Sequence, residues 1–317
     1  MPADRHGAPK MIPGLLSVVF PNYNHSAYVG AQLRAILAES YRNIEVIMID
    51  DASTDNSIAV IEAAIGNDPR VRFFKNEKNQ GVQKNLHRAR ELANGEFIYM
   101  CAADDLVLPG LFEKGISLLR QAPQAGISLT QMAWIENNGA TIRPMPLRLM
   151  PQPTFLPPDA FCDAICGEHI TGHSAIMRMD MFDRATPPLD DFYALKWHSD
   201  WFIGTVLACR HGLCYNPEVL TAIRVGDTNY STAGMYKIEL QKVVVKTAFR
   251  LLKSEQFRDV LPHFVRGAIF SGIPLVAQIV LSDPELWDTE SLLLAQKCIS
   301  DWNEERRQFQ RSRWVQK

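Results

Sequence analysis

The chain has 317 residues, of which 47% are hydrophobic and 21% are charged, and its formal net charge at pH 7 is −2. This composition is typical of a globular protein with a sizeable core, and the length suits one large α/β domain with an extension or two modest domains. A net charge so close to zero gives no strong positive field that would attract nucleic acid or an anionic membrane. We therefore expect no nucleic-acid partner.

The first 130 residues alternate between strand and helix patterns. Short runs of apolar residues predict strands, and apolar residues spaced three and four apart predict helices. The predicted strands are 15–20, 44–49, 71–74, 97–101 and 127–135, and the predicted helices are 29–37, 58–65, 82–93 and 111–119. Such alternation predicts an α/β fold with a mostly parallel sheet flanked by helices. Ligands of such sheets bind beyond the carboxyl ends of the strands.

The second half of the chain is less regular. Residues 143–158 contain six prolines and are expected to form a surface loop or linker. A helix is predicted at 200–209, and helices are predicted throughout the C-terminal region. We therefore divide the chain into an N-terminal tail at 1–13, a domain at 14–230 and a helical extension at 231–317.

No segment predicts export or a membrane span. The apolar run Leu15–Phe20 is shorter than the roughly 7–15 residues of a signal-peptide core. The uncharged stretch Gly267–Leu281 is shorter than the roughly 20 residues of a spanning helix and is interrupted by Pro274, so a buried core helix is expected there. The six cysteines form no Cys-x-x-Cys pair and are expected to be reduced and mostly buried. These features predict a cytoplasmic protein, while peripheral membrane contact and a homo-oligomer stay open.

The residues after the first predicted strand suggest a binding place for the base of a nucleotide. Pro21-Asn22-Tyr23-Asn24 should take the chain out of the sheet, because proline has no N–H for the ladder. Tyr23 would then lie at the ligand-binding edge, where its ring could flank a base. An ordinary turn with a packed tyrosine is the alternative.

Two adjacent carboxylates, Asp50 and Asp51, end the second predicted strand. Carboxylates are costly to bury, so these must be solvated or hydrogen-bonded. A carboxylate at this edge can accept the imide N–H of uracil or thymine. The residues that follow, Ser53, Thr54 and Asp55, are good helix N-caps, and both roles can hold at once.

A second acidic pair, Asp104 and Asp105, follows the fourth predicted strand. A hard divalent cation prefers oxygen ligands, and a diphosphate supplies several of them. One carboxylate and a diphosphate can therefore hold Mn²⁺ or Mg²⁺ together. An Asp-Asp pair before a helix is also a common cap.

Together these segments resemble glycosyltransferase family 2, whose members are inverting enzymes with the Rossmann-like GT-A fold. The resemblance extends over residues 14–230 and rests on the order and spacing of short motifs. These are Pro21-Asn22-Tyr23-Asn24, Ile49–Asp55, Asn79-Gln80-Gly81 followed by Asn85, Ala93–Ile98, and Ala103-Asp104-Asp105 followed by Pro109. The resemblance implies a nucleotide-binding half at 14–135 and an acceptor half at 136–230.

The resemblance also implies individual roles on the donor side. Asp51 would contact the base of a nucleotide diphosphate sugar, and Asp104 stands where the family's Asp-x-Asp motif has its metal-binding carboxylate, which implies Mn²⁺ or Mg²⁺ as the cofactor. The other implied donor contacts are Pro21, Tyr23, Asn24, Lys84, Ala103 and Arg224. Two positions depart from the family pattern, because Ala102 replaces the first Asp of Asp-x-Asp and Gly226 replaces the histidine of an Arg-x-His segment.

On the acceptor side, His198-Ser199-Asp200-Trp201 opens a helix where the family presents its general base. Asp200 is the candidate base, and a helix N-terminal carboxylate favoured by the dipole is the alternative. Trp201 is a candidate acceptor wall or a core residue, and Gly172 and His173 are candidates for the sugar or acceptor pocket. If the base lies elsewhere, the next carboxylates to test are Asp190, Asp191 and Glu168.

These residues predict inverting transfer of a sugar from a UDP- or TDP-linked donor, with Asp200 taking the proton of the acceptor hydroxyl. A glycan, a lipid-linked sugar and a protein are all open as acceptors, and cell-surface polysaccharide or glycan synthesis is the expected setting. A catalytically degenerate nucleotide-sugar-binding protein is one alternative, favoured by Ala102 and Gly226. A sugar nucleotidyltransferase is another, but the Gly-rich basic loop expected after its first strand is missing from the sequence.

Overall fold

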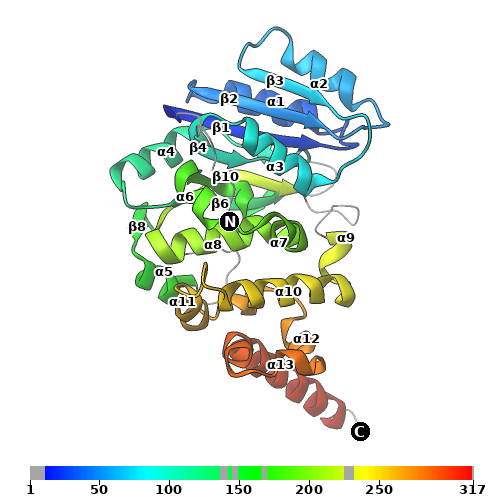
Figure 1. Ribbon diagram of the computed structural model, residues 1–317, viewed down its shortest axis with the longest axis vertical. Coiled ribbons are helices and arrows are strands. Elements are labelled where there is room, and N and C mark those ends of the chain that lie inside the picture. The colour runs from blue at the N-terminus through cyan, green and yellow to red at the C-terminus, as the bar shows by residue number, and fades with distance from the viewer. Residues whose placement is uncertain (1–10, 136–141, 145–148, 166–169, 225–231, 316–317) are drawn as a thin grey trace.

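The computed structural model describes residues 11–135, 142–144, 149–165, 170–224 and 232–315, of which 142–144, 232–233 and 305–315 are described by their backbone alone. The described chain forms one ten-stranded sheet with helices on both faces (Figure 1). The strands are β1 (Ile12–Asn22), β2 (Ile44–Asp50), β3 (Val71–Lys75), β4 (Gly95–Met100), β5 (Leu106–Val107), β6 (Ile127–Ile135), β7 (Ile142–Pro144), β8 (Thr154–Leu156), β9 (Ala175–Arg178) and β10 (Leu213–Arg224).

The order of the strands across the sheet is β3-β2-β1-β4-β9-β6-β10-β5, with β7 paired to β6 and β8 paired to β10. Parallel pairing joins β3, β2, β1 and β4 to one another and β6 to β10, which includes all the long strands. The antiparallel pairings are only two or three residues long. The sheet is therefore mostly parallel, as predicted, with the short β9 inserted antiparallel between β4 and β6.

The helices α1 to α4 alternate with the first strands, which confirms the sequence prediction for this half. The longer helices are α1 (Val29–Ala38), α2 (Ser57–Ile65), α3 (Val82–Leu92), α4 (Leu111–Gln121), α5 (Pro158–Ile165), α6 (Met179–Ala185), α7 (Leu189–Ala194), α8 (Ser199–His211), α9 (Thr232–Met235), α10 (Ile238–Lys253), α11 (Leu261–Arg266), α12 (Val276–Ser282) and α13 (Thr289–Val315). The 3-10 turns are η1 (Gly172–Ser174), η2 (Lys196–His198), η3 (Ile269–Gly272) and η4 (Pro284–Leu286).

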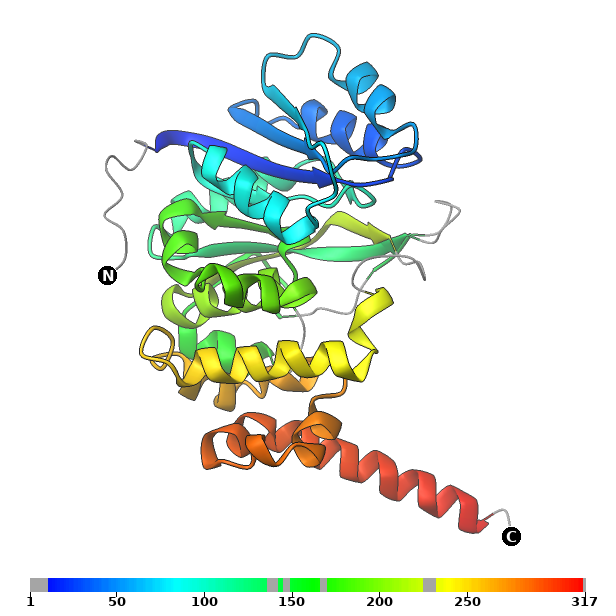
Figure 2. The same cartoon turned by 45° about the vertical axis from the view of Figure 1, so that its right-hand side comes forward.

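The two faces of the sheet carry separate hydrophobic clusters, because successive strand residues point to opposite sides. Val18 and Phe20 of β1 pack with apolar residues of α1 and α4, whereas Val19 packs with those of α3, α6 and α8. The cluster that contains Val19 continues into α10, α11, α12 and α13. The C-terminal helices therefore form a further layer beyond α8 (Figure 2).

Three details differ from the sequence prediction. β1 runs one residue past Pro21, because β4 pairs with β1 only as far as Val19 and the missing N–H therefore breaks no ladder there. The proline-rich stretch is not wholly a loop, since β8 adds to the sheet beside β10. Gly267–Leu281 is not one buried helix, because Ala268 and Leu275 have left-handed φ angles of 47° and 65° and divide it into the turn η3 and the short helix α12.

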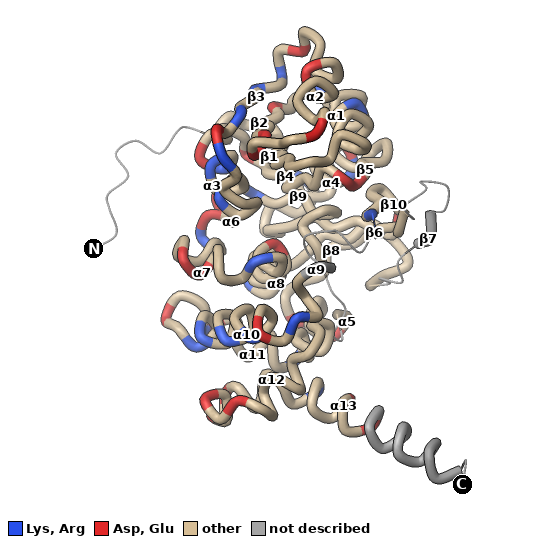
Figure 3. Tube along the Cα trace, turned by 90° about the vertical axis from the view of Figure 1, so that its right-hand side faces the viewer, with Lys and Arg blue, Asp and Glu red and all other residues tan. Residues whose placement is uncertain are grey.

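Ion pairs fasten α10 to the segment that leads into α13. Lys242 Nζ lies 3.1 Å from Oδ2 of the buried Asp283, and Lys253 Nζ lies 2.8 Å from Asp288 Oδ2. Asp288 also caps α13, because it accepts the Ser291 N–H at 3.0 Å. Figure 3 shows basic residues on α10 and acidic residues on the segment that leads into α13, and the pairs between them join the two.

No helix among the described residues is long and apolar enough to cross a membrane. The described cysteines are free and buried, in agreement with the prediction, and Cys166 lies outside the described residues. Gly226, Glu168 and the predicted tail up to residue 10 also lie outside them.

Candidate active site

The predicted site residues gather at one edge of the sheet. β1, β2 and β4 run parallel and β9 runs antiparallel to β4, so three strand ends meet the segment that enters β9. The chain builds outward from β1 to β2 and β3, then returns to the other side of β1 with β4. Open α/β sheets bind ligands at such a switch of direction.

The first of the two carboxylates after β2 is structural. Asp50 is fully buried and accepts the Asn22 side-chain amide at 2.8 Å. It also accepts the N–H and the hydroxyl of Ser53, at 2.9 and 2.7 Å. Asp50 therefore ties the end of β1 to the loop that follows β2.

The second carboxylate, Asp51, is surrounded by amide donors. It accepts the side-chain amide of Asn76 and the backbone N–H groups of Gln80 and Gly81, each at 2.8 Å. Burial opposes ionisation of Asp51, but the amide donors outweigh it and lower the pKa of the carboxyl. A charged, rigidly held carboxylate thus stands at the end of β2.

The loop after β1 presents Tyr23 to solvent. Tyr23 is 42% exposed, and Pro21 before it is buried in the strand. Asn24 has a left-handed φ of 55°, and its side-chain oxygen accepts the Thr54 N–H at 2.8 Å. Asn24 therefore fastens the loop that carries Tyr23 to the loop after β2.

Asp104 lies half-buried just beyond β4, after the buried Ala103. Within the described part of the chain, its carboxylate has no hydrogen-bond or ion-pair partner, whereas its backbone carbonyl accepts Arg224 Nε at 3.0 Å. The Arg224 guanidinium stacks 4.1 Å from the centre of the Tyr28 ring. Lys84 is exposed on the first turn of α3. Two cations and one available carboxylate are thus brought to this edge.

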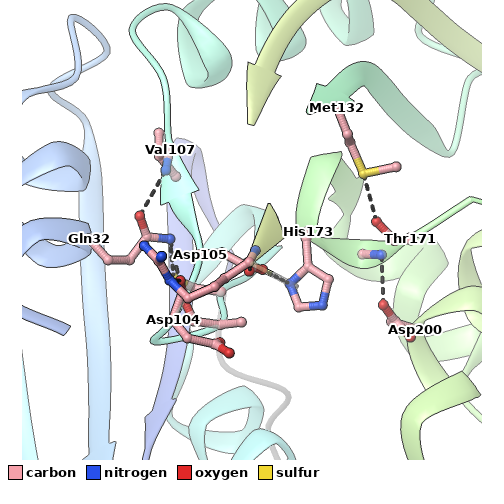
Figure 4. Close-up of polar contacts among 12 residues, drawn as sticks. Gln32, Asp104, Asp105, Val107, Met132, Thr171, His173 and Asp200 are labelled. Atoms are coloured by element: carbon pink, nitrogen blue, oxygen red, sulfur yellow. Dashed lines mark hydrogen bonds and ion pairs between the residues drawn. The ribbon is translucent and has the colours of Figure 1, made fainter. Parts of the chain in front are cut away.

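Asp105 is buried behind Asp104 and faces His173 of η1 (Figure 4). His173 Nδ1 lies 3.1 Å from Asp105 Oδ2 as an ion pair without hydrogen-bond alignment, and the Arg224 N–H donates to Oδ1 at 3.0 Å. Burial raises the pKa of Asp105 to about 6. Burial favours a neutral His173, but the carboxylates of Asp105, Asp200 and Asp104 outweigh it and raise the pKa of the imidazole.

Asp200 lies in the first turn of α8, across His173 from the Asp104-Asp105 pair (Figure 4). Its Oδ2 accepts the Gly172 N–H at 2.7 Å, and Oδ1 has no partner among the described residues. A Cβ at Gly172 would lie 2.8 Å from Asp200 Cβ and 3.1 Å from Met100 Cε. Only glycine fits here without moving the carboxylate.

Other predicted residues lie elsewhere. Trp201 is 1% exposed, with its ring packed edge-on against Phe264 and Phe270, which favours the core residue of its two predicted places. Asp191 is ion-paired with Arg250, and Asp190 is exposed on α7. No sequence pattern indicated the Asp105–His173 pair or the stacking of Tyr28 under Arg224, because both join segments distant in the chain.

The residues at this edge fit a metal that arrives with the donor. No group of three His, Cys, Asp or Glu side chains in the described chain could hold an ion by itself. Asp104 supplies one hard oxygen ligand, and Mg²⁺-type sites commonly combine one or two carboxylates with substrate phosphates and water. Mn²⁺ or Mg²⁺ therefore suits this donor set only if a diphosphate completes it.

A family comparison agrees with this geometry. The profile described as Glycosyl transferase family 2 matches residues 17–185, more than half of the chain. The chain belongs to glycosyltransferase family 2.

Curated relatives match a smaller part of the chain. An "uncharacterized glycosyltransferase" of Haemophilus influenzae is 36% identical over 107 residues, which cover 34% of this chain and 43% of the relative. The Escherichia coli protein named UDP-Glc:alpha-D-GlcNAc-diphosphoundecaprenol beta-1,3-glucosyltransferase WfgD is 30% identical over 106 residues, 33% of this chain and 41% of the relative. The chain thus matches less than half the length of these relatives.

Solved structures share the fold over most of the chain. TarS 1-349 of S. aureus in complex with UDP-GlcNAc has a TM-score of 0.58 at 15% identity and covers 89% of this chain and 78% of TarS 1-349. The mannosyltransferase PcManGT from Pyrobaculum calidifontis, in complex with GDP-Man and Mn²⁺, has a TM-score of 0.53 at 16% identity and covers 98% and 86%. At such low identities these likenesses establish the GT-A fold, as predicted.

Proposed function

We propose that the protein transfers a sugar, with inversion, from a UDP- or TDP-sugar to an acceptor hydroxyl. The observation that carries the proposal is the placement of Asp51, Asp104 and Asp200 at one edge of the sheet in three different environments. Asp51 is held charged by amide donors, Asp104 is unpartnered within the described chain, and Asp200 is held through one oxygen. We propose that Asp51 binds the nucleotide base, that Asp104 binds the metal and the diphosphate, and that Asp200 takes the acceptor proton.

Asp51 is the proposed contact to the base. A carboxylate oxygen has two lone pairs, so an oxygen that accepts one N–H, as Oδ2 does from Gly81 at 2.8 Å, can accept a second donor. A lone pair therefore remains for the N3–H of uracil or thymine, with Tyr23, Pro21 and Asn24 bordering the ring. Guanine does not place the same donor there, and an unpaired partner costs about 1–3 kcal/mol, so UDP should bind at least about tenfold more tightly than GDP.

Asp104, Lys84 and Arg224 are the proposed diphosphate contacts. A Mn²⁺ or Mg²⁺ ion held by Asp104 and the donor would supply charge that stabilises the leaving diphosphate. Arg224 is already fixed by the Asp104 carbonyl and the Tyr28 ring, so its positive charge is in place before the donor binds.

Asp200 is the proposed general base. The Gly172 N–H occupies Oδ2, so Oδ1 is the oxygen that would take the acceptor proton. The hydroxyl oxygen then bonds to the anomeric carbon while the bond from that carbon to the diphosphate breaks, which inverts the configuration. His173 lies between the Asp104-Asp105 pair and Asp200, and we therefore keep Gly172 and His173 as proposed residues of the sugar pocket.

The acceptor is proposed by analogy alone. The WfgD relative is named for transfer to a diphosphoundecaprenol-linked sugar. A lipid-linked or glycan acceptor in cell-surface polysaccharide synthesis therefore leads our proposal, and a peripheral membrane contact would follow from it. The cytoplasmic location and the homo-oligomer stay predictions from the sequence.

A substitution at the candidate base tests the proposal. Asp200→Asn should keep the donor Kd within about twofold and reduce single-turnover transfer by about 10²–10⁴-fold, the usual contribution of general-base catalysis. Donors are first ranked by thermal shift, where a ligand at 100 times its Kd stabilises by about 2.7 kcal/mol. Release of UDP with water as the acceptor provides the rate if no natural acceptor is known. Transfer within a few-fold of wild type would exclude Asp200 as the base.

One observation favours a second function. Ala102 stands in place of the first Asp of the family's motif, and no three-ligand metal group exists among the described side chains. A nucleotide-sugar-binding protein without transferase activity would have these features. It would bind UDP-sugars normally and show the same negligible turnover in wild type and Asp200→Asn.

A further inference from the structure

The segment that leads into Asp200 is held in a strained conformation. Lys196, at the start of η2, has a left-handed φ of 48°, which residues with a side chain rarely adopt. η2 is followed directly by Ser199 and Asp200 at the start of α8. The direction in which Asp200 points therefore depends on whatever holds residues 196–199.

Gln83 of α3 holds this segment from one side. Its side-chain N–H donates to the Lys196 carbonyl, and its side-chain oxygen accepts the Ser199 hydroxyl at 3.2 Å. One buried amide thus satisfies both ends of the strained turn. Gln83 lies two residues after Gly81, whose N–H binds Asp51, so the same helix terminus contacts the donor side of the site.

Gln241 of α10 holds the segment from the other side. It is fully buried, and its side-chain oxygen accepts the Trp197 ring N–H at 3.3 Å. Because an indole nitrogen can only donate, this bond fixes the amide so that its nitrogen faces His198 Nε2 and the Pro274 carbonyl, each at 3.2 Å. His198 Nε2 therefore accepts, and the His198 proton lies on Nδ1.

We propose that Gln83 and Gln241 are positioning residues that clamp residues 196–199 and so aim the Asp200 carboxylate, which makes the C-terminal layer part of the catalytic machinery. This inference rests on the proposed role of Asp200 as the base. α7, which η2 follows, lies between α3 and α10 (Figure 1), and the bonds to residues 196–199 come from both of these helices. Both glutamines act through the segment they bind, because their side-chain hydrogen bonds go to residues 196–199 and the Pro274 carbonyl.

The test replaces each amide by an apolar side chain of similar size. Gln241→Leu and Gln83→Met should each lower single-turnover transfer by about 10–10²-fold, the effect of a displacement near 1 Å at a reacting group, and leave the UDP Kd within about twofold. Amide hydrogen exchange of residues 196–204 should become faster in both variants. Ser199→Ala removes only the bond to Gln83 and should give a smaller loss of the same kind, which keeps the test available if a core variant does not fold.

A double-mutant cycle separates positioning from ordinary destabilisation. If the glutamines act through Asp200, Gln241→Leu should change transfer by less than about twofold in an Asp200→Asn background. A rate loss that is equally large in that background, or that is matched by weaker UDP binding, would overturn the proposal. So would exchange protection at 196–204 equal to wild type. Gln121→Leu, on the exposed surface of α4, should change none of these readouts.

The same experiments keep this inference distinct from the assignment of the base. Full transfer by Asp200→Asn with transfer lost in Gln241→Leu would reject Asp200 as the base. Normal hydrogen exchange with transfer lost only in Asp200→Asn would reject the clamp and keep the base.

Discussion

Replacing Gly172 by alanine tests how closely the Asp200 carboxylate is held. The added Cβ would lie 2.8 Å from Asp200 Cβ and 3.0 Å from Oδ2. Optimal carbon–carbon contacts are about 3.5–4.0 Å, so Asp200 or the η1 backbone must shift by about 0.7 Å or more. A shift near 1 Å at a reacting group costs about 10²-fold, and we expect Gly172→Ala to lower transfer by about 10–10²-fold.

Donor affinity should not follow this loss, because Asp51 and Tyr23 lie on the other half of the edge. The assay is UDP binding by calorimetry beside single-turnover transfer. Gly204→Ala is the matched control, since it adds the same Cβ in α8 but meets only the Ile127 side chain at 3.3 Å and Ile170 at 3.5 Å. Transfer by Gly172→Ala within threefold of the Gly204→Ala control would refute the reasoning.

Three further variants test other parts of the site and fold. Asp104→Asn should abolish transfer and weaken metal-dependent UDP binding without lowering Tm, and full turnover of wild type in excess EDTA would contradict this metal role. Asp50→Ala leaves Asn22 and Ser53 without their buried acceptor and should lower the free energy of unfolding by about 3 kcal/mol in urea titrations. A decrease of less than about 1 kcal/mol would argue against this structural role of Asp50. Burial alone would raise the pKa of Asp288, but hydrogen bonds from Lys253 and Ser291 lower it to about 2. Wild type should therefore lose stability as pH falls from about 4 toward about 2, because Asp288 becomes protonated. An equal loss of stability in Asp288→Ala over the same pH range would refute this.

The first half of the fold was predictable because its signals are local. β1, β2 and β4 are mainly apolar and buried on both faces of a parallel sheet, and the helices that follow the first strands have an apolar stripe. The acidic pairs were predictable for the same reason, since strand ends are read directly from the sequence. What the pairs do was not, because Asp50 and Asp51 differ only in partners that come from Asn22, Ser53 and the 76–81 loop.

The second half resisted prediction because its elements depend on distant contacts. β9 has four residues and gains strand geometry by lying between β4 and β6. Gly172 shows its importance only through Asp200, which is 28 residues away. Of the two alternatives for Trp201, the core could have been preferred from the sequence, because the run from Trp201 to Cys209 has no polar face and such a helix is internal, as its burial shows.

The two connections between α10 and its neighbours differ in how they respond to ionic strength. The pair between Lys253 and Asp288 joins opposite charges near the surface, where a Debye length of about 8 Å at 0.15 M shrinks to about 3 Å at 1 M. The bonds of Gln241 are neutral and buried, so added salt hardly screens them. Concentrated salt should therefore loosen the link between α10 and the start of α13 while the grip of α10 on residues 197 and 198 persists.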